Sequence, residues 1–234
     1  MMRDTVRGPA PSEEPVLENG VISHASLPEA VYLLLRRRIL NNEFIAGERL
    51  VEAKLAEELG VSRTTIRSAL RELANESLVE ITKRRGCFVT RMTPQEIQDS
   101  CFARYLLEAG VASEDLHWIT PAVLAELEEQ IENMKVAALN ADMASIVDAD
   151  TAFHGIIMSA GDRSRVTALW HMLDGQMGSL MRSSMDQQGI DMSEIVLRHR
   201  EVIEALETRK VSVIQQSIKE HYVRAPSVLG AVEA

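Results

Sequence analysis

One stretch leaves this chain few choices of fold: LAEELGVSRTTIRSALRELAN, residues 55–75. Its first half places apolar residues at helical spacing and stops at Gly60, a residue suited to the left-handed position that ends a helix. Ser62 is a good N-cap for a second helix, in which Ile66, Leu70 and Leu73 share one face. Two short helices around a tight turn are typical of a helix-turn-helix, although an ordinary helical hairpin has the same periodicity.

The outer face of the second helix favours a DNA-binding helix-turn-helix, because its residues are basic or hydroxylated. Arginine can fork onto guanine in the major groove or neutralise phosphate, and threonine can bond phosphate or touch a thymine methyl. A helical hairpin with a solvated, charged face is the competing interpretation. The predicted DNA contacts on this helix are Ser62, Arg63, Thr64, Thr65, Arg67 and Arg71.

The next segment, SLVEITKRRGCFVTR over residues 77–91, alternates apolar and polar residues on both sides of a basic tip. This pattern predicts a two-stranded hairpin, with Gly86 supplying the turn. A hairpin directly after a helix-turn-helix makes a winged helix. Arg84, Arg85 and Gly86 are then placed to reach a minor groove or phosphates.

The charge distribution supports a chain of two domains. The net charge of −10 does not by itself suit a DNA-binding protein, but the charge is distributed unevenly along the sequence. Residues 27–91 hold 12 Lys and Arg against 9 Asp and Glu, whereas residues 92–234 hold 11 against 22. Positive charge therefore gathers where DNA would bind. We expect a disordered tail over 1–26, a DNA-binding domain over 27–91, a second domain over 92–225 and a short tail over 226–234.

The second domain shows helical patterns and no strand signal. We expect helices at about 94–117, 121–140, 143–160, 163–186, 192–209 and 211–224, and an earlier one at 28–42 that is capped by Ser26. Short links predict an antiparallel bundle. The predicted fold is therefore mainly α: an N-terminal winged helix-turn-helix followed by an all-α antiparallel helical bundle. The run Arg36–Arg38 predicts a solvated face.

Compartment and redox state are suggested by three features. No apolar run is long enough to span a membrane, and the first 26 residues lack a signal core, so we expect a cytoplasmic protein without a membrane partner. Cys87 and Cys101 are the only cysteines and do not suggest a disulfide. Cys87 stands near arginines that could lower its thiol pKa and make it an oxidant sensor, although a small strand residue is the simpler interpretation.

Four side chains in the bundle are candidate metal ligands. Asp150 and His154 are four residues apart and share a helix face, while His199 and His221 each stand on a later helix. Converging in a core, they would hold a divalent ion such as Zn, Ni or Mn. Spacing alone leaves open the simpler alternative of three unrelated core histidines.

The N-terminal motifs resemble a known family. LVEAKLAEELGVSRTTIRSALREL followed by RRGCFV resembles the DNA-binding domain of the GntR family of bacterial transcription regulators. Two positions depart from its pattern: Thr65 stands where most relatives have proline, and Ser77 where most have glycine. The resemblance implies a homodimer that reads an inverted repeat in double-stranded DNA.

The bundle resembles the FCD ligand-binding domain, which defines the FadR subfamily of those regulators. The segments ADTAFHGIIMSAGD, LRHREVIEALETRK and SIKEHY carry this resemblance. It implies that the metal ligands are Asp150, His154, His199 and His221. It also implies that Arg104 binds a carboxylate effector, against the structural alternative of a helical pair with Glu108, and Arg182 is a second candidate contact.

The sequence thus predicts a metabolite-responsive, DNA-binding regulator of transcription that binds a divalent metal and a small organic acid. A repressor is favoured over an activator. One alternative is a metal-responsive regulator that senses the ion itself. Another is a metal-dependent hydrolase or lyase fused to a DNA-binding domain, which lacks a general base next to the candidate ligands. We therefore expect no enzyme activity.

Overall fold

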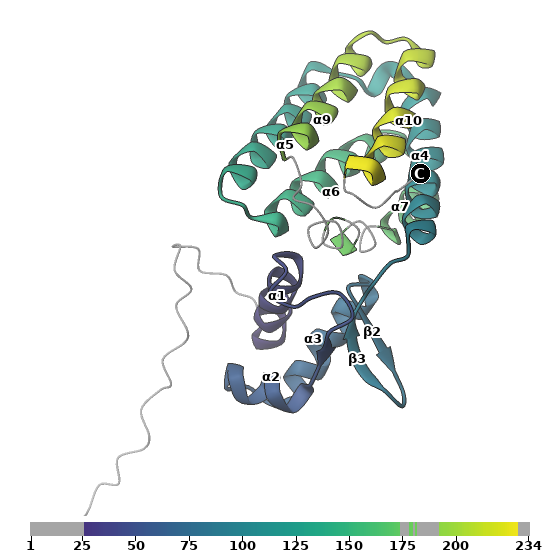
Figure 1. Cartoon of the computed structure of the whole chain (residues 1–234). Coiled ribbons are helices and arrows are strands. Elements are labelled where there is room, and N and C mark those ends of the chain that lie inside the picture. Colours follow the sequence, from purple (N-terminus) through teal and green to yellow (C-terminus); the bar gives the residue numbers. More distant parts are fainter. Residues whose placement is uncertain (1–25, 174–177, 180, 182–191, 229–234) are drawn as a thin grey trace, which may run out of the picture.

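The computed structural model describes residues 26–173, 178, 179, 181 and 192–228. Within these ranges the chain forms a small winged-helix domain and a larger helical bundle, joined at one end of each (Figure 1). The predicted fold class is confirmed: a mainly helical chain with a winged helix-turn-helix before a helical bundle. The expected tail over 1–26 lies outside the described residues except for Ser26.

The first domain holds three helices and a small sheet: α1 (Leu27–Leu40), β1 (Arg49–Leu50), α2 (Glu52–Leu59), α3 (Arg63–Asn75), β2 (Val79–Thr82) and β3 (Gly86–Val89). Ser26 caps α1 as predicted, and the Glu29 carboxylate three residues later accepts a hydrogen bond from the Ser26 backbone N–H at 3.3 Å. Buried Leu35 and Ile39 of α1 belong to the same hydrophobic core as Ile66, Leu70 and Leu73 of α3. This packing turns the polar face of α3 outward.

The sheet is antiparallel, with strand order β1-β3-β2. The sequence pattern did not predict its first strand, β1. Two residues carry no readable alternation, and β1 exists because Arg49 and Leu50 pair with Phe88 and Cys87. The strand lies beside β3, and the Arg49 side chain reaches Gly86 near the turn of the hairpin.

The second domain is formed by α4 (Pro94–Glu114), α5 (Pro121–Leu139), α6 (Met143–Ser159), α7 (Ser164–His171), α9 (Met192–Glu207) and α10 (Val211–Val228). A 3-10 turn, Leu116–Trp118, ends the segment that was expected to be one helix over 94–117. The helix expected over 163–186 stops at His171, and the residues after Leu173 lie largely outside the described ranges. None of the described helices is long and apolar enough to cross a membrane.

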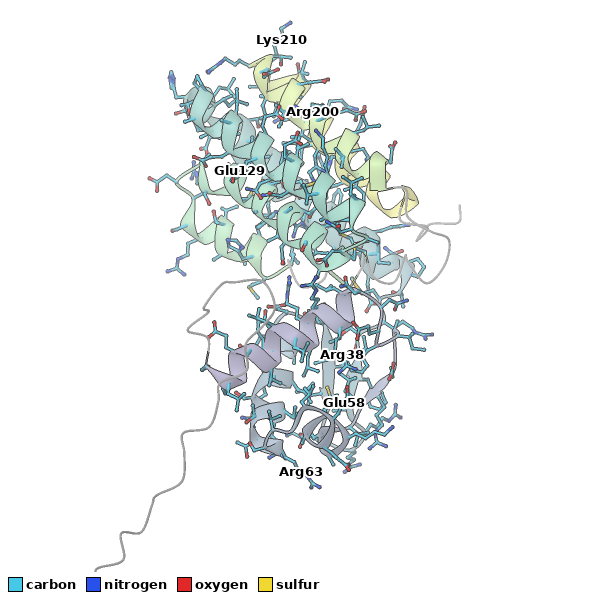
Figure 2. All side chains as sticks on the ribbon, turned by 90° about the vertical axis from the view of Figure 1, so that its left-hand side faces the viewer. Arg38, Glu58, Arg63, Glu129, Arg200 and Lys210 are labelled. Atoms are coloured by element: carbon cyan, nitrogen blue, oxygen red, sulfur yellow. The ribbon has the colours of Figure 1, made fainter. Side chains whose placement is uncertain are left out.

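The two domains meet where α1 lies against the start of α6 (Figures 1 and 2). The Asn41 side chain accepts a hydrogen bond from the Ala144 backbone N–H at 3.1 Å. Arg37 forms an ion pair with Asp142, and Arg36 forms one with Asp148 of α6, both at 2.7 Å. The arginine run expected to be a solvated face is therefore used in ion pairs, because these acids stand opposite it.

Candidate functional site

The turn between α2 and α3 follows from its cap residues. Gly60 ends α2 in the left-handed conformation, at φ 65° and ψ 27°. Ser62 caps α3, and its hydroxyl accepts a hydrogen bond from the Thr65 N–H at 3.1 Å. The Thr65 hydroxyl also lies 2.9 Å from that of Ser62. Proline at 65 has no N–H to donate, so the departure at Thr65 adds a cap bond.

The predicted DNA contacts of α3 lie largely on its exposed side. Ile66, Ala69 and Leu70 are buried beneath them. Arg63 lies at the end of the molecule opposite the bundle and projects away from it (Figure 2). Ser62 and Thr65 use their hydroxyls in the cap. The exposed predicted contacts are Ser62, Arg63, Thr64, Arg67 and Arg71.

The wing carries the other predicted contacts at its tip. Arg84 and Arg85 are exposed in the turn between β2 and β3. Gly86 has φ 104°, a value that L residues rarely adopt. An added Cβ at Gly86 would also meet the Arg49 guanidinium at 3.4 Å. That distance is an ordinary van der Waals contact, so the backbone conformation favours glycine here, and Arg49, which the sequence reasoning did not single out, lies beside it.

A groove of about 400 Å³ runs between α3 and the wing. Four of its lining side chains are cationic: Arg49, Arg67, Arg71 and Lys83. Glu52, at the first position of α2, enters the same groove and binds Arg67 through two hydrogen bonds, at 2.7 and 3.0 Å. The surface thus combines a basic groove, a basic tip and an exposed helix, which suits a duplex.

The four candidate metal ligands come together in the bundle core. Asp150 and His154 extend from α6, His199 from α9 and His221 from α10. One donor atom from each lies within 4.8 Å of all the others, and all four side chains are buried. Asp150 Oδ1 is 3.1 Å from His199 Nε2 and 3.9 Å from His154 Nε2. A buried cluster of this composition is consistent with a metal site.

Hydrogen bonds behind the imidazoles fix which nitrogen faces the cluster. His199 Nδ1 donates to the Ile195 carbonyl at 2.8 Å, and His154 Nδ1 donates to Glu108 Oε1 at 2.8 Å. The Nε2 lone pairs of both rings are thereby left for a metal. The Nε2 atoms of His154 and His221 lie only 3.1 Å apart, so at most one of them can carry a proton between them.

Two observations test whether these residues fit a divalent ion. His199 Nε2 and His221 Nδ1 have no hydrogen-bond partner among the described residues, although both are buried. Burial would raise the Asp150 pKa, but His199, whose Nε2 lies 3.1 Å from Asp150 Oδ1, and the nearby His154 outweigh it and hold the pKa at about 2. Burial, with His199 and His154 close by, lowers the pKa of His221 well below its ordinary value. An ionised carboxylate and neutral imidazole are the forms that ligate metals, so the residues fit.

Glu108 and Tyr222 support the cluster and were not predicted as a part of it. The Tyr222 hydroxyl donates to Glu108 Oε2 at 2.6 Å, and Glu108 itself is fully buried. The sequence offered one signal: Glu108 stands four residues after Arg104, and it was considered there only as a helical ion-pair partner. Instead its carboxylate receives bonds from His154 and Tyr222.

Arg104, the predicted effector contact, is fully buried. Its guanidinium carbon lies 4.1 Å from the Trp170 ring centroid and 5.8 Å from that of Tyr222. Its Nε donates to the Tyr222 hydroxyl at 3.4 Å, so Tyr222 links Arg104 to the Glu108–His154 pair. Arg182, the second predicted contact, lies outside the described residues.

These two sites define a class: a DNA-binding transcription regulator with a separate helical domain. A family profile described as bacterial regulatory proteins, gntR family, matches residues 27–89, and the FCD domain profile matches residues 99–224. The chain belongs to the GntR family of bacterial regulators, in the FadR-like group whose second domain is an FCD domain.

Individual relatives agree with this assignment. The gluconate operon transcriptional repressor of Bacillus subtilis (strain 168) is 29% identical over 205 residues, covering 86% of this chain and 84% of its own. The transcriptional repressor RspR of Escherichia coli (strain K12) is 23% identical over 82% of this chain and 84% of its own. The solved structure of E. coli McbR/YncC is similar in fold, with a TM-score of 0.69 at 22% identity, covering 88% of this chain and 98% of its own. The chain is accordingly a regulator of transcription and not an enzyme.

Proposed function

We propose that the protein is a cytoplasmic, metabolite-responsive repressor that holds a divalent metal in its FCD domain. It acts as a homodimer, and each protomer places α3 in the major groove of one half of an inverted repeat. The observation that carries the proposal is the convergence of Asp150, His154, His199 and His221 within 4.8 Å in the domain that adjoins the DNA reader. The named repressors among the relatives support the sign of regulation.

The ligand set narrows the choice of metal. Three imidazoles favour Zn or Ni, and the carboxylate of Asp150 keeps Mn among the candidates. The hydrogen bonds at the His154 and His199 Nδ1 atoms orient both rings toward one point. When bound, the metal would supply a Lewis-acidic contact for an anionic oxygen of the effector.

The effector class follows from charge and from Arg104. A small organic acid, such as a sugar acid, would use its carboxylate at the metal and pair with the Arg104 guanidinium. Arg104 is held between Trp170 and Tyr222, so its charge is already desolvated and oriented. The B. subtilis relative is named for the gluconate operon, which supports a sugar acid as the first class to test. Arg182 is proposed as a second anion contact.

A route from the effector site to the DNA reader runs along α6. This helix carries Asp150 and His154, while its Asp142 and Asp148 pair with Arg37 and Arg36 of α1. Effector binding would favour one arrangement of the reader domains, and its effect on operator affinity can be no larger than its differential affinity for the two arrangements.

A thermal-shift screen of organic acids on the full chain tests the proposal, with and without a chelator. We expect one acid to raise the melting temperature only in the metal-loaded protein, because a ligand of the native state stabilises it. His199→Ala should abolish that shift. A footprint on the chromosomal DNA flanking the gene should show a protected inverted repeat, and protection without sequence preference would overturn the assignment.

A second candidate is a regulator for which the ion itself is the signal. Four buried protein donors form a nearly complete coordination sphere by themselves, which favours this alternative. Titrating metal into operator binding in the absence of any acid separates the two. A large change in operator affinity with metal alone supports the second candidate, and a change only on adding acid supports the first.

A further inference from the structure

One carboxylate lies in the basic groove between α3 and the wing. Among the described residues lining this groove, Glu52 is the only acid beside four Arg and Lys side chains. A carboxylate facing a polyanion opposes binding, because it repels the phosphates that its neighbours attract. We therefore expect Glu52 to have a role at this position that compensates for its repulsion of the DNA phosphates.

The geometry shows what Glu52 holds. Its two oxygens accept from Nε and Nη2 of Arg67, at 3.0 and 2.7 Å, in the side-on bidentate arrangement. The pairing fixes a long side chain that would otherwise sample many rotamers. The bond to Arg67 also lowers the pKa of Glu52, so the carboxylate is ionised at neutral pH.

The side-on pairing leaves the other edge of the guanidinium open. Each terminal nitrogen, Nη1 and Nη2, keeps an outward N–H, and these two are parallel. A guanine presents two acceptors, O6 and N7, at the spacing that such an edge fits. Arg67 stands one helical turn after Arg63 on the exposed face of α3, so the open edge belongs to the helix that would enter the major groove.

We propose that Glu52 is the positioning residue that makes Arg67 a guanine reader. It holds the guanidinium from behind, and Arg67 presents its free edge to O6 and N7 of one guanine in each half-site. Glu52 thus raises sequence specificity while it lowers general affinity for DNA. This inference rests on the proposed placement of α3 in the major groove.

Two other roles for Glu52 predict different behaviour. As an acid in the first turn of α2 it could merely stabilise that helix, and its loss would lower the melting temperature without changing the preferred sequence. As a latch that must release Arg67 before DNA binds, its loss would strengthen specific binding. Positioning predicts weaker discrimination between sequences with retained or stronger binding to random DNA.

The experiment selects preferred sites from a random-centre duplex library with the full-length protein. The variants are Glu52→Gln, which loses one acceptor oxygen, and Arg67→Lys, which keeps the charge but cannot fork. Glu57→Gln, an exposed acid elsewhere on α2, is the matched control for losing one negative charge. Circular dichroism melting of each variant controls for folding, and Glu52→Asp tests rescue by a retained carboxylate.

We expect one guanine position of the wild-type site to lose its preference in both Glu52→Gln and Arg67→Lys, and to keep it in Glu57→Gln. Since a good bidentate base contact discriminates by about 1–3 kcal/mol, Arg67→Lys should lower the specific-to-random affinity ratio by roughly 5- to 150-fold. Glu52→Gln should lower it by at least about fivefold, near the lower end of that range. Glu52→Asp should recover part of the preference.

Each contrary outcome points to a different error. If Arg67→Lys loses the guanine and Glu52→Gln keeps it, the positioning role is wrong while α3 remains the reader. If Arg67→Lys alters only the salt dependence and not the site, Arg67 contacts phosphate and the proposal is overturned. If neither these variants nor Arg63→Ala alters the preferred site, the placement of α3 itself fails.

Discussion

Replacing Glu108 with Gln tests whether the buried hydrogen bonds around His154 prepare it as a ligand. The carboxylate accepts from His154 Nδ1 at 2.8 Å and from the Tyr222 hydroxyl at 2.6 Å, one bond on each oxygen. Glutamine keeps the shape but offers one oxygen and one NH₂ group. The NH₂ group then faces either the Nδ1–H of His154 or the hydroxyl of Tyr222, so two hydrogen-bond donors oppose each other and one bond is lost.

The expected loss follows from those two bonds. A hydrogen bond to a charged group contributes about 1.5–3 kcal/mol, and the site is dry because Glu108 and His154 are buried. If the NH₂ group faces His154, the ring proton moves to Nε2 and removes the lone pair that the cluster needs. At about 1.4 kcal/mol per tenfold change, the metal dissociation constant should rise roughly 10- to 100-fold.

Competition against a fluorescent chelator measures this constant directly on the purified full chain. Glu114→Gln is the matched control, since Glu114 ends the same helix and pairs with Arg163 at the surface. It should bind metal as the wild type does. A Glu108→Gln protein that folds and binds metal within about twofold of the wild type would refute the reasoning, because a supporting partner is worth at least tenfold.

Three further changes have defined outcomes. Asp148→Asn breaks the pair with Arg36, so it should leave metal affinity unchanged and lower the effector-induced change in operator affinity by about two- to fivefold, measured by fluorescence anisotropy. Burial raises the thiol pKa of Cys87 and of Cys101 to about 11, so iodoacetamide at pH 8 should modify neither until urea unfolds the chain, as mass spectrometry will show. Because the folded protein holds these two thiols neutral, its free energy of unfolding is highest below the pKa of an unfolded thiol and falls as the pH rises toward 11. Ser77→Gly should raise the free energy of unfolding by roughly 0.5–1 kcal/mol in urea, because Ser77 has φ 58°.

The DNA-reading half was predictable because its signals are local. Gly60 and Ser62 each fix a helix end through their own backbone preference, and Gly86 fixes the wing turn in the same way. The third strand was not predictable, since Arg49 and Leu50 become a strand only by pairing with residues on β3. Ser77 illustrates the same local logic: its φ of 58° is one that glycine adopts more readily, in line with the glycine that the family resemblance implies at this position.

The lowered thiol pKa on which the oxidant-sensing alternative for Cys87 rested is contradicted by the burial of this residue. Sequence proximity to arginines suggested a lowered pKa, but burial on β3 raises it, and Glu52 adds to the rise. Neighbours in sequence alternate between the faces of a strand, so nearby arginines need not face the thiol.

The candidate metal site was predictable only with the family resemblance. Periodicity places each histidine on a helix face, but whether α6, α9 and α10 turn those faces toward one point depends on packing across the bundle. Glu108 and Tyr222 were harder still to predict from the sequence, because they meet only when α4 packs against α10. A buried acid and a buried phenol give no periodic signal that separates them from surface residues.

The placement of the ligands on α6 bears on how a signal could leave the site. Asp148 precedes Asp150 by two residues, a rise of about 3 Å along the helix axis, and Asp142 lies at the helix start. A helix moves as a rigid body over such lengths, so a shift at Asp150 reaches the pairs with α1 without any loop rearrangement. Arg36 extends the contact, because it also pairs with Glu76 at the end of α3. One arginine thus joins the helix of the candidate metal site to the end of the helix proposed to read DNA, and its loss should uncouple the two functions before it weakens either one.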